Sequence, residues 1–226
     1  FLSVRAAIRA HVLFMKSEQG GNGEAARKEA KRYFVLAGRL MTPAPPLLVV
    51  VGGLSGTGKS VLARGLAGPM EPVPGAVLVH SDVVRQRLFD VSETTALPEA
   101  AYHVGTSRLV YNELSKTAQR ILAQGYSVVL DAAFILEAAR ADFADLARGH
   151  KVRFVGLFLT ADLATRLARI EQRKHDASDA TREVALKQEN FVIGAMDWHV
   201  VDASGTPDDT LRRSRGWLSD RGPASR

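Results

Sequence analysis

The chain has 226 residues, of which 46% are hydrophobic and 24% charged, a composition typical of a globular protein with one domain and an appendage. It contains no cysteine, which excludes disulfides and thiolate metal sites and is consistent with a cytoplasmic protein. The net charge of +6 suits a polyanionic partner such as a nucleotide, a phosphorylated substrate or RNA, although high arginine use in a GC-rich genome explains it equally well.

The sequence also argues against a membrane protein and a zinc protein. A membrane-spanning helix needs about 20 predominantly apolar residues, and no run here approaches that length. The six histidines lack the spacing of a structural zinc site. No signal-peptide pattern is present, and the chain begins with Phe1 rather than Met, so we expect a piece of a longer protein or a processed chain.

Residues 1–42 are expected to form a helical hairpin. One face of residues 2–15 carries an apolar stripe at helical spacing, formed by Val4, Ile8, Val12 and Met15. Glycines interrupt this helix, residues 24–41 form a second one, and three prolines make residues 43–46 a stiff linker. Two helices are too few to fold alone, so the hairpin either packs on the following domain or ends a preceding one.

The next segment is a complete phosphate-binding loop. Residues 53–60 fit the pattern G-x-x-x-x-G-K-[ST] between a buried-strand pattern at 47–51 and a helix pattern at 61–67. This context argues against a glycine-rich turn with an incidental lysine. We expect Lys59 to reach the β- and γ-phosphates and the Ser60 hydroxyl to bind Mg²⁺. The expected nucleotide-binding residues of the loop are Gly53, Ser55, Gly56, Thr57, Gly58, Lys59, Ser60 and Val61.

Beyond the loop, strand and helix patterns alternate. Further strands are expected at 77–79, 127–130, 152–159 and 200–201. Helices are expected at 82–88, 99–124, 136–149, 162–174, 181–191 and 207–218. This alternation predicts an α/β fold of the P-loop NTPase class, with a five-stranded parallel sheet in three αβα layers and the ligand beyond the carboxyl ends of the strands. We expect residues 47–218 to form this domain and residues 219–226 a flexible tail.

Asp82 is the candidate general base. It follows the second strand, where a carboxylate facing the phosphate loop can take a hydroxyl proton and orient the oxygen toward the γ-phosphorus. Arg85 lies on the same helical face and is expected to hold substrate or to pair with a carboxylate. A simpler interpretation is that Ser81 or Asp82 caps the helix, which does not exclude catalysis.

The third strand ends in a second carboxylate, Asp131. It is expected to hold the water shell of Mg²⁺, to pair with Arg85, or to act only as a strand-end cap. An ATP-hydrolysing motor would want glutamate at the next position to activate water, but this position holds Ala132. The pair therefore favours transfer to an organic acceptor over hydrolysis.

Three arginines in helical register, Arg166, Arg169 and Arg173, lead into a polar segment at 174–180. Helix, polar loop and helix are typical of a closing lid whose arginines neutralise the transferred phosphoryl group, and Arg169 and Arg173 are nearer the loop. A solvated basic face is the alternative. After the fifth strand, Asp202 and Ala203 begin a run of small residues that would let adenine approach, or form an ordinary turn into the last helix.

The remaining aromatic and histidine residues receive structural interpretations. Tyr102, His103 and Tyr111 are candidates for an acceptor pocket, but packing on a helix face is the preferred explanation. Trp198 and His199 are expected to be structural, and Trp217 to pack the last helix on the core.

These motifs resemble those of the P-loop kinases related to polynucleotide kinase, gluconate kinase and zeta toxins. Residues 47–218 also look like the C-terminal domain of bacterial bifunctional aminoglycoside phosphotransferase/ATP-binding proteins, and residues 1–42 look like the last helices of the phosphotransferase-like domain that precedes it there. The resemblance implies a kinase fold, ATP with Mg²⁺, and an aspartate base. It implies no acceptor, because the aminoglycoside label belongs to the upstream domain and residues 90–105 show no known pocket motif.

The sequence therefore predicts a kinase that uses ATP, or GTP instead, to phosphorylate a nucleic-acid 5′-hydroxyl, a nucleoside or a small polyol. The candidate catalytic residues are Lys59, Asp82, Arg85, Arg169 and Arg173, and the candidate metal ligands are Ser60 and Asp131. Two other functions remain open: a nucleotide-binding module that regulates a neighbouring domain, and an NTPase that transfers phosphate to water.

Overall fold

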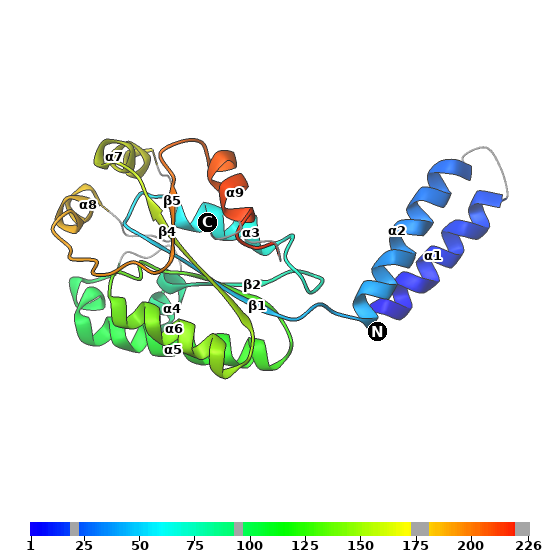
Figure 1. Ribbon diagram of the computed structural model, residues 1–226, viewed down its shortest axis with the longest axis horizontal. Helices are drawn as coiled ribbons and strands as arrows, with labels where there is room; N and C mark the ends of the chain where they lie inside the picture. The colour runs from blue at the N-terminus through cyan, green and yellow to red at the C-terminus, as the bar shows by residue number, and fades with distance from the viewer. Residues whose placement is uncertain (19–22, 93–96, 173–180, 220–226) are drawn as a thin grey trace.

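The computed structural model describes residues 1–18, 23–92, 97–172 and 181–219 (Figure 1). Five parallel strands form one sheet in the order β2-β3-β1-β4-β5. They are β1 (Leu47–Gly53), β2 (Val77–His80), β3 (Val128–Asp131), β4 (Arg153–Thr160) and β5 (His199–Asp202). The predicted five-stranded parallel sheet is thus confirmed, and its central strand is the one that leads into the phosphate loop.

Helices cover both faces of this sheet, as Figure 1 shows. On one face lie α3 (Lys59–Ala67) and α9 (Pro207–Arg215), and on the other α4 (Ser81–Leu88), α5 (Val104–Ala123) and α6 (Glu137–Gly149). β1 is buried on both sides because Leu48 and Val50 face one helix layer while Val49 and Val51 face the other. The three-layer architecture is therefore confirmed.

Two shorter helices, α7 (Leu163–Glu171) and α8 (Arg182–Gln188), lie beyond the carboxyl ends of the strands (Figure 1). They replace longer helices expected at 162–174 and 181–191, and residues 173–180 are outside the described part of the chain. The single helix expected at 99–124 is divided into a 3₁₀ turn, η1 (Glu99–Tyr102), and α5, because His103 is extended with φ −63° and ψ 154°.

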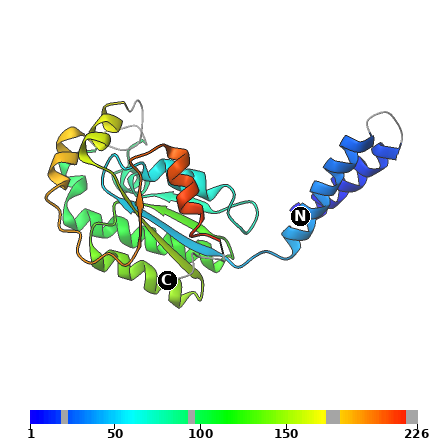
Figure 2. The same ribbon diagram turned by 45° about the horizontal axis from the view of Figure 1, so that its top comes forward.

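The N-terminal helices α1 (Leu2–Glu18) and α2 (Gly23–Met41) form the predicted hairpin and stand apart from the αβα domain (Figure 2). Small side chains make the seam between them, with Ala6, Ala10, Ala30 and Ala37 buried. An ion pair of Arg39 with Glu71 joins the hairpin to the domain. The hairpin therefore does not pack on the domain that follows, and its place at the end of a preceding one stays a prediction.

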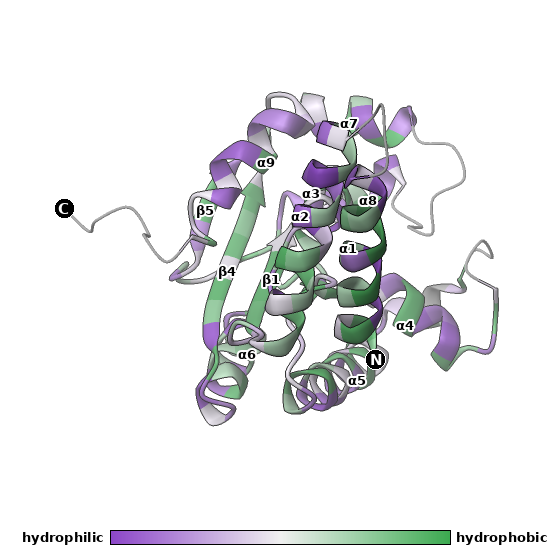
Figure 3. Ribbon diagram, turned by 90° about the vertical axis from the view of Figure 1, so that its right-hand side faces the viewer, coloured by the Kyte–Doolittle hydropathy of each residue, from purple (hydrophilic) through white to green (hydrophobic). Residues whose placement is uncertain are grey.

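The apolar stripe of α1 faces outward. Val4, Ile8, Val12 and Met15 are all exposed, Ile8 to 59% of its surface. Figure 3 shows hydrophobic stretches alternating with hydrophilic ones along both hairpin helices. Across the described residues, no helix combines the length and the apolar character that crossing a membrane requires.

Candidate nucleotide and acceptor site

The phosphate loop joins the end of β1 to the start of α3. Gly53, Gly56 and Gly58 have φ values of 134°, 83° and 91°, which side chains rarely adopt. A Cβ on Gly56 would also lie 2.5 Å from the carbonyl oxygen of Arg166, so the loop and α7 are in close backbone contact. The last two residues of the loop, Lys59 and Ser60, are the first two of α3, and the amino end of a helix is a favourable place for an anion.

Asp131 ends β3 beside this loop and pairs with His80 at the end of β2. His80 Nδ1 lies 2.8 Å from Asp131 Oδ2. The hydrogen bond to Asp131 raises the pKa of His80, against the opposing effect of burial. Burial alone would raise the pKa of Asp131, but the His80 hydrogen bond, the charge of Lys59 and the Ser60 hydroxyl outweigh it and lower that pKa. Asp131 is therefore an ionised carboxylate at the phosphate loop.

Ser60 and Asp131 together fit Mg²⁺. They offer a hydroxyl and a carboxylate that line the same cavity, and both are the oxygen donors that Mg²⁺ prefers. Within the described residues no group of three or more His, Cys, Asp or Glu could hold a metal ion.

A cavity of about 340 Å³ opens at this edge of the sheet and is called here the carboxyl-edge cavity. It is lined by residues of the phosphate loop, α4, α5, α8 and the strand ends, among them Ser55, Lys59, Ser60, Asp82, Arg85, Tyr102, Ser107, Tyr111, Asp131, Lys187, Gln188 and Phe191. The structure thus brings seven predicted site residues to one cavity: Ser55, Gly56, Lys59, Ser60, Asp82, Arg85 and Asp131. The N-cap position of α4 is His80, whose side chain makes no capping hydrogen bond.

The position of Arg85 is inconsistent with one of its predicted roles, an ion pair with Asp131. It is only 8% exposed, and its guanidinium donates a hydrogen bond to the carbonyl of Ala101 and lies 5.0 Å from the ring centroid of Tyr102. The suggested ion pair between Arg85 and Asp131 is wrong, because Asp131 binds His80 instead. Arg85 is left as a cation facing the cavity.

Tyr111 both packs against other aromatic rings and lines the cavity, which the sequence analysis treated as alternatives. Its ring packs edge-on against Phe134 at 5.2 Å, and its hydroxyl accepts a hydrogen bond of 2.9 Å from the backbone N–H of Phe134. It also lines the carboxyl-edge cavity, as Tyr102 does. Burial raises the pKa of Tyr111 to about 12, so its hydroxyl keeps its proton at neutral pH. The two tyrosines are therefore lining residues as well as packing ones.

The tryptophans are structural, as expected. Trp198 is buried in the core beside Phe134, with ring centroids 5.2 Å apart. Trp217 stacks on His199 at 3.7 Å and packs the end of the last helix on the core. Neither residue belongs to the lining of the carboxyl-edge cavity.

Arg166 and Gln188 fasten α7 and α8 to the phosphate loop, which the sequence did not predict. Arg166 is 1% exposed, donates from Nε to the carbonyl of Ser55 at 2.8 Å, and pairs with Glu189. Gln188 Oε1 accepts from the N–H of Ser55 at 2.7 Å, and its Nε2 donates to Ser55 Oγ at 3.0 Å. The arginine stripe signalled Arg166 but not its burial, and no sequence signal pointed to Gln188.

The other predicted residues lie away from the carboxyl-edge cavity or outside the described chain. Arg169 donates a hydrogen bond of 2.8 Å to the carbonyl of Gly205, so it borders the loop that follows β5 instead of lining the cavity. In that loop Asp202 accepts from the N–H of Ser204 at 2.9 Å, and Ala203 is buried. Arg173 falls within residues 173–180 and is not described. Arg169, Asp202 and Ala203 thus form a second group, beside the predicted adenine position.

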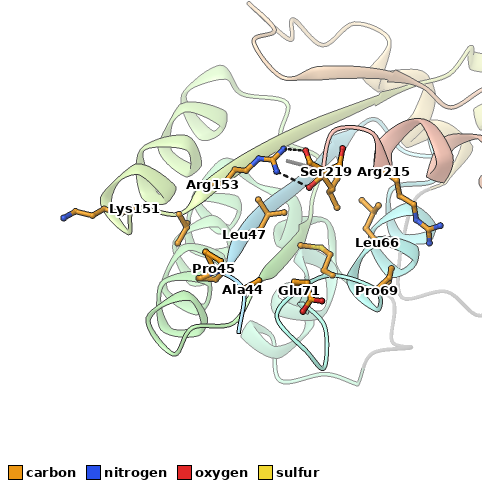
Figure 4. A pocket seen from close by; sticks show the side chains of 14 residues that line it. Ala44, Pro45, Leu47, Leu66, Pro69, Glu71, Lys151, Arg153, Arg215 and Ser219 are labelled. Carbon is orange, nitrogen blue, oxygen red and sulfur yellow. Dashed lines mark hydrogen bonds between the residues drawn. The ribbon is translucent and has the colours of Figure 1, made fainter. Parts of the chain in front are cut away.

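A larger cavity, of about 530 Å³, lies at the opposite edge of the sheet and is called here the amino-edge cavity (Figure 4). It opens near the first residues of β1 and β4, and its lining includes Pro45, Leu47, Leu66, Lys151 and Arg153. Arg153 donates to the backbone carbonyls of residues 217, 218 and 219. Its position places it away from the phosphate loop, so it is not the nucleotide site.

Comparison with known proteins identifies relatives of the domain. Residues 48–192 match the protein family described as an AAA domain. The uncharacterized protein Rv2004c of Mycobacterium tuberculosis and its counterpart Mb2027c of Mycobacterium bovis are each 32% identical over 212 residues, which is 91% of this chain but 41% of either relative. The chain therefore spans less than half the length of the curated relatives it matches.

Solved structures with a similar fold include P-loop kinases. A gluconokinase from Sinorhizobium meliloti aligns with a TM-score of 0.53 and 18% identity over 75% of this chain and 89% of that one. A sugar kinase from Janibacter sp. aligns with a TM-score of 0.55 and 18% identity over 80% of this chain and 99% of that one. Kti12 from Chaetomium thermophilum, solved with ADP-AlF₃, aligns with a TM-score of 0.53 and 15% identity over 76% of this chain and 96% of that one.

Proposed function

Since the chain belongs to the AAA domain family and has the fold of P-loop kinases, we propose that it transfers the γ-phosphoryl group of ATP to an acceptor hydroxyl, with Asp82 as the general base. The observation that carries the proposal is the carboxyl-edge cavity, which places Asp82 in the same space as Lys59, Ser60 and Asp131. A base that shares a cavity with the phosphate-binding residues can meet both the acceptor and the terminal phosphate.

The phosphate-binding residues position the nucleotide. The backbone of the loop and the amino end of α3 bind the phosphates, and Lys59 neutralises charge on the β- and γ-oxygens. Ser60 and Asp131 would hold Mg²⁺, which supplies further charge neutralisation when bound. Arg166 and Gln188 keep α7 and α8 against the loop, where they exclude water from the reacting group.

Asp82 accepts the proton of the acceptor hydroxyl as its oxygen bonds to the γ-phosphorus. The bond from that phosphorus to the β,γ-bridging oxygen breaks, ADP leaves with the electron pair, and Asp82 then releases the proton to solvent. Arg85, three residues further on α4, positions the acceptor. Arg169 with Asp202 and Ala203 borders the base of the nucleotide, and Arg173 remains a proposed phosphoryl ligand. GTP is the alternative donor.

Regulation of a neighbouring domain is the second candidate function, and the exposed stripe of α1 favours it. Val4, Ile8, Val12 and Met15 present apolar surface that the described domain leaves uncovered. The longer relatives leave room for a partner domain, which we propose to be the phosphotransferase-like domain that the sequence resemblance implies. In that case nucleotide binding would change the neighbour without any phosphate transfer.

A transfer screen separates these functions. Labelled ATP and GTP are offered with RNA 5′ ends, nucleosides and sugars to the wild type, to Asp82→Asn and to Asp90→Asn, a matched control because Asp90 is exposed and outside the lining. We expect Asp82→Asn to lower acceptor-dependent transfer about 10²–10⁴-fold with nucleotide binding intact. Nucleotide binding without product would support the regulatory module, and free phosphate alone would support the NTPase.

A further inference from the structure

The acceptor side of the carboxyl-edge cavity holds a buried cation. Arg85 is 8% exposed, and among the described residues its guanidinium has one hydrogen bond, to the carbonyl of Ala101. Its Nε is buried without a hydrogen-bond partner in the described part of the chain. Guanidinium carries five N–H donors, and a buried charge is costly unless it is paired. The ring of Tyr102 offers it a cation–π contact, which leaves most of these donors unused.

Other donors face the same space. The Tyr111 hydroxyl already accepts a hydrogen bond from Phe134, so its own proton is available for an oxygen in the cavity. Asp82 and Arg85 line the same cavity as Tyr111, and the charges of both act on its pKa. Ser107 and Lys187 complete the polar lining with a hydroxyl and a second cation. The acceptor side is therefore arranged to donate hydrogen bonds to a negatively charged group.

The spacing of these residues limits the size of the acceptor. Asp82 and Arg85 are three residues apart on α4, so their Cβ atoms are about 5–6 Å apart. The cavity of about 340 Å³ is near the lower limit of small-molecule sites, and the terminal phosphates of the nucleotide must occupy part of it. A hydroxyl at Asp82 and an anion at Arg85 thus belong to one compact molecule.

We propose that the acceptor is a small hydroxylated anion whose phosphate or carboxylate group binds Arg85 and Tyr111 while its hydroxyl meets Asp82. This inference rests on the proposed function and specifies its acceptor class. It selects among the earlier candidates, because it favours an acidic polyol or a phosphorylated small molecule over a neutral sugar or a nucleic-acid strand.

The first test compares acceptors that differ only in the anionic group. The pairs are glycerol 3-phosphate with glycerol, gluconate with glucitol, and a nucleoside 3′-monophosphate with its nucleoside, with a 5′-hydroxyl oligonucleotide as a further arm. We expect the wild type to use the charged member of at least one pair with kcat/KM at least about 10-fold higher. Equal use of both members throughout, or product from the oligonucleotide alone, overturns the proposal.

Variants then assign the preference to its residues. Arg85→Met should abolish the preference by lowering kcat/KM for the charged member alone, and Tyr111→Phe, which keeps the ring packing, should reduce it by a smaller factor. Arg87→Met makes the same chemical change on the exposed side of α4 and should leave both members unaffected. Equal losses for charged and neutral members in Arg85→Met and Tyr111→Phe would show a structural role and overturn the proposal.

A binding measurement makes the inference independent of turnover. Inorganic phosphate and glycerate are titrated calorimetrically into protein saturated with Mg²⁺ and a non-hydrolysable ATP analogue, so that the phosphate loop is filled. We expect one of the two anions to bind the wild type and Arg87→Met but not Arg85→Met. Failure of both to bind the wild type overturns the proposal. If an anion binds but no phosphate is transferred, the anion subsite is supported and the proposed kinase function is contradicted. If phosphate is transferred without a preference for anionic acceptors, the kinase function is supported and the subsite is contradicted.

Discussion

The two edges of the sheet both contain a cavity and cations, but they use them differently. At the carboxyl edge Arg85 and Lys59 face the smaller cavity, beside the carboxylates Asp82 and Asp131. At the amino edge Arg153 lines the larger cavity, but its guanidinium donates to three backbone carbonyls, those of residues 217, 218 and 219. Volume therefore does not identify the site. What distinguishes the carboxyl edge is that its charged side chains share their cavity with the phosphate loop.

This difference follows from topology. In the order β2-β3-β1-β4-β5, the first strand, β1, lies between β3 and β4. The chain adds β2 and β3 on one side of β1 and then crosses to add β4 and β5 on the other side, so the direction of strand addition reverses at β1. A crevice forms at such a switch point beyond the carboxyl ends of the strands, and ligands of open α/β sheets bind there. The amino-edge cavity lies at the opposite ends of the strands, away from this switch point, which is consistent with the structural use of Arg153.

The largest expected effect comes from removing a lysine at the carboxyl edge, compared with removing one at the amino edge. Lys59→Met removes a cation from the phosphate loop and should lower transfer at least about 100-fold, because preorganised charge at the reacting phosphate is lost. Lys151→Met makes the same change at the amino-edge cavity and should leave kcat/KM within about twofold. Steady-state kinetics and nucleotide titration measure both, and an equal loss in the two variants would remove the distinction between the edges.

A second contrast lies within the phosphate loop. Alanine at Gly58 should cost about 1–2 kcal/mol of unfolding free energy, because φ is 91° and nothing lies within 4 Å of the added Cβ. Alanine at Gly56 should cost about 1–3 kcal/mol more, because its Cβ would lie 2.5 Å from the Arg166 carbonyl oxygen. Urea denaturation without nucleotide measures both values. Equal costs would mean that α7 is not packed on the loop.

At the amino edge the expected effect is on stability alone. Arg153→Met removes hydrogen bonds to the carbonyls of Trp217, Leu218 and Ser219, of which the shortest is 2.7 Å. Because the group is exposed, we expect a loss of about 1 kcal/mol in the free energy of unfolding and no change in transfer rate. Arg120→Met on the exposed side of α5 is the control for a surface arginine. A slower phosphate transfer in Arg153→Met would contradict the prediction and show that the amino edge affects the reaction at the carboxyl edge.

Local sequence patterns predicted the fold and the part of the candidate site formed by the phosphate loop and the strand ends. The phosphate loop is a contiguous motif, and Asp82 and Asp131 directly follow strands, so their meeting at one edge follows from a parallel sheet alone. The strands were recognisable because strands buried on both faces are apolar runs. These inferences needed the order of elements but no side-chain packing.

The missed contacts depend on packing between distant segments. Ser55 is 111 residues from Arg166 and 133 residues from Gln188, and no periodicity reports which side chain will reach it. The arginine stripe also could not show that Arg166 turns inward while Arg169 reaches Gly205, because a helical repeat gives a face but not what lies opposite. The apolar stripe at Ile8 shows the same limit, since its spacing predicted a contact face that the described domain leaves exposed.

The smallest expected effect is a pair of opposite pH dependences at the two edges, measured without Mg²⁺ or nucleotide. At the carboxyl end of β2, Asp131 raises the pKa of His80, Asp82 reinforces this, and burial and Arg64 oppose it. The contribution of His80 to stability is therefore complete below about pH 6.5 and is lost as the pH rises through its folded pKa. At the amino end of β5, burial of His199 against Trp217 lowers its pKa.

The contribution of neutral His199 to folding stability is therefore present above about pH 6.5 and is lost as the pH falls through its lowered folded pKa. Between pH 7.5 and pH 5.5, acidification should therefore reduce the gap in urea midpoint between wild type and His199→Gln and widen the gap for His80→Gln. The two substitutions are chemically identical, so general acid effects on the protein cancel between them. A carboxylate partner at His80 and an apolar partner at His199 should change the two gaps in urea midpoint in opposite directions. If both gaps change in the same direction, the charges around His80 and the burial of His199 do not distinguish the two edges.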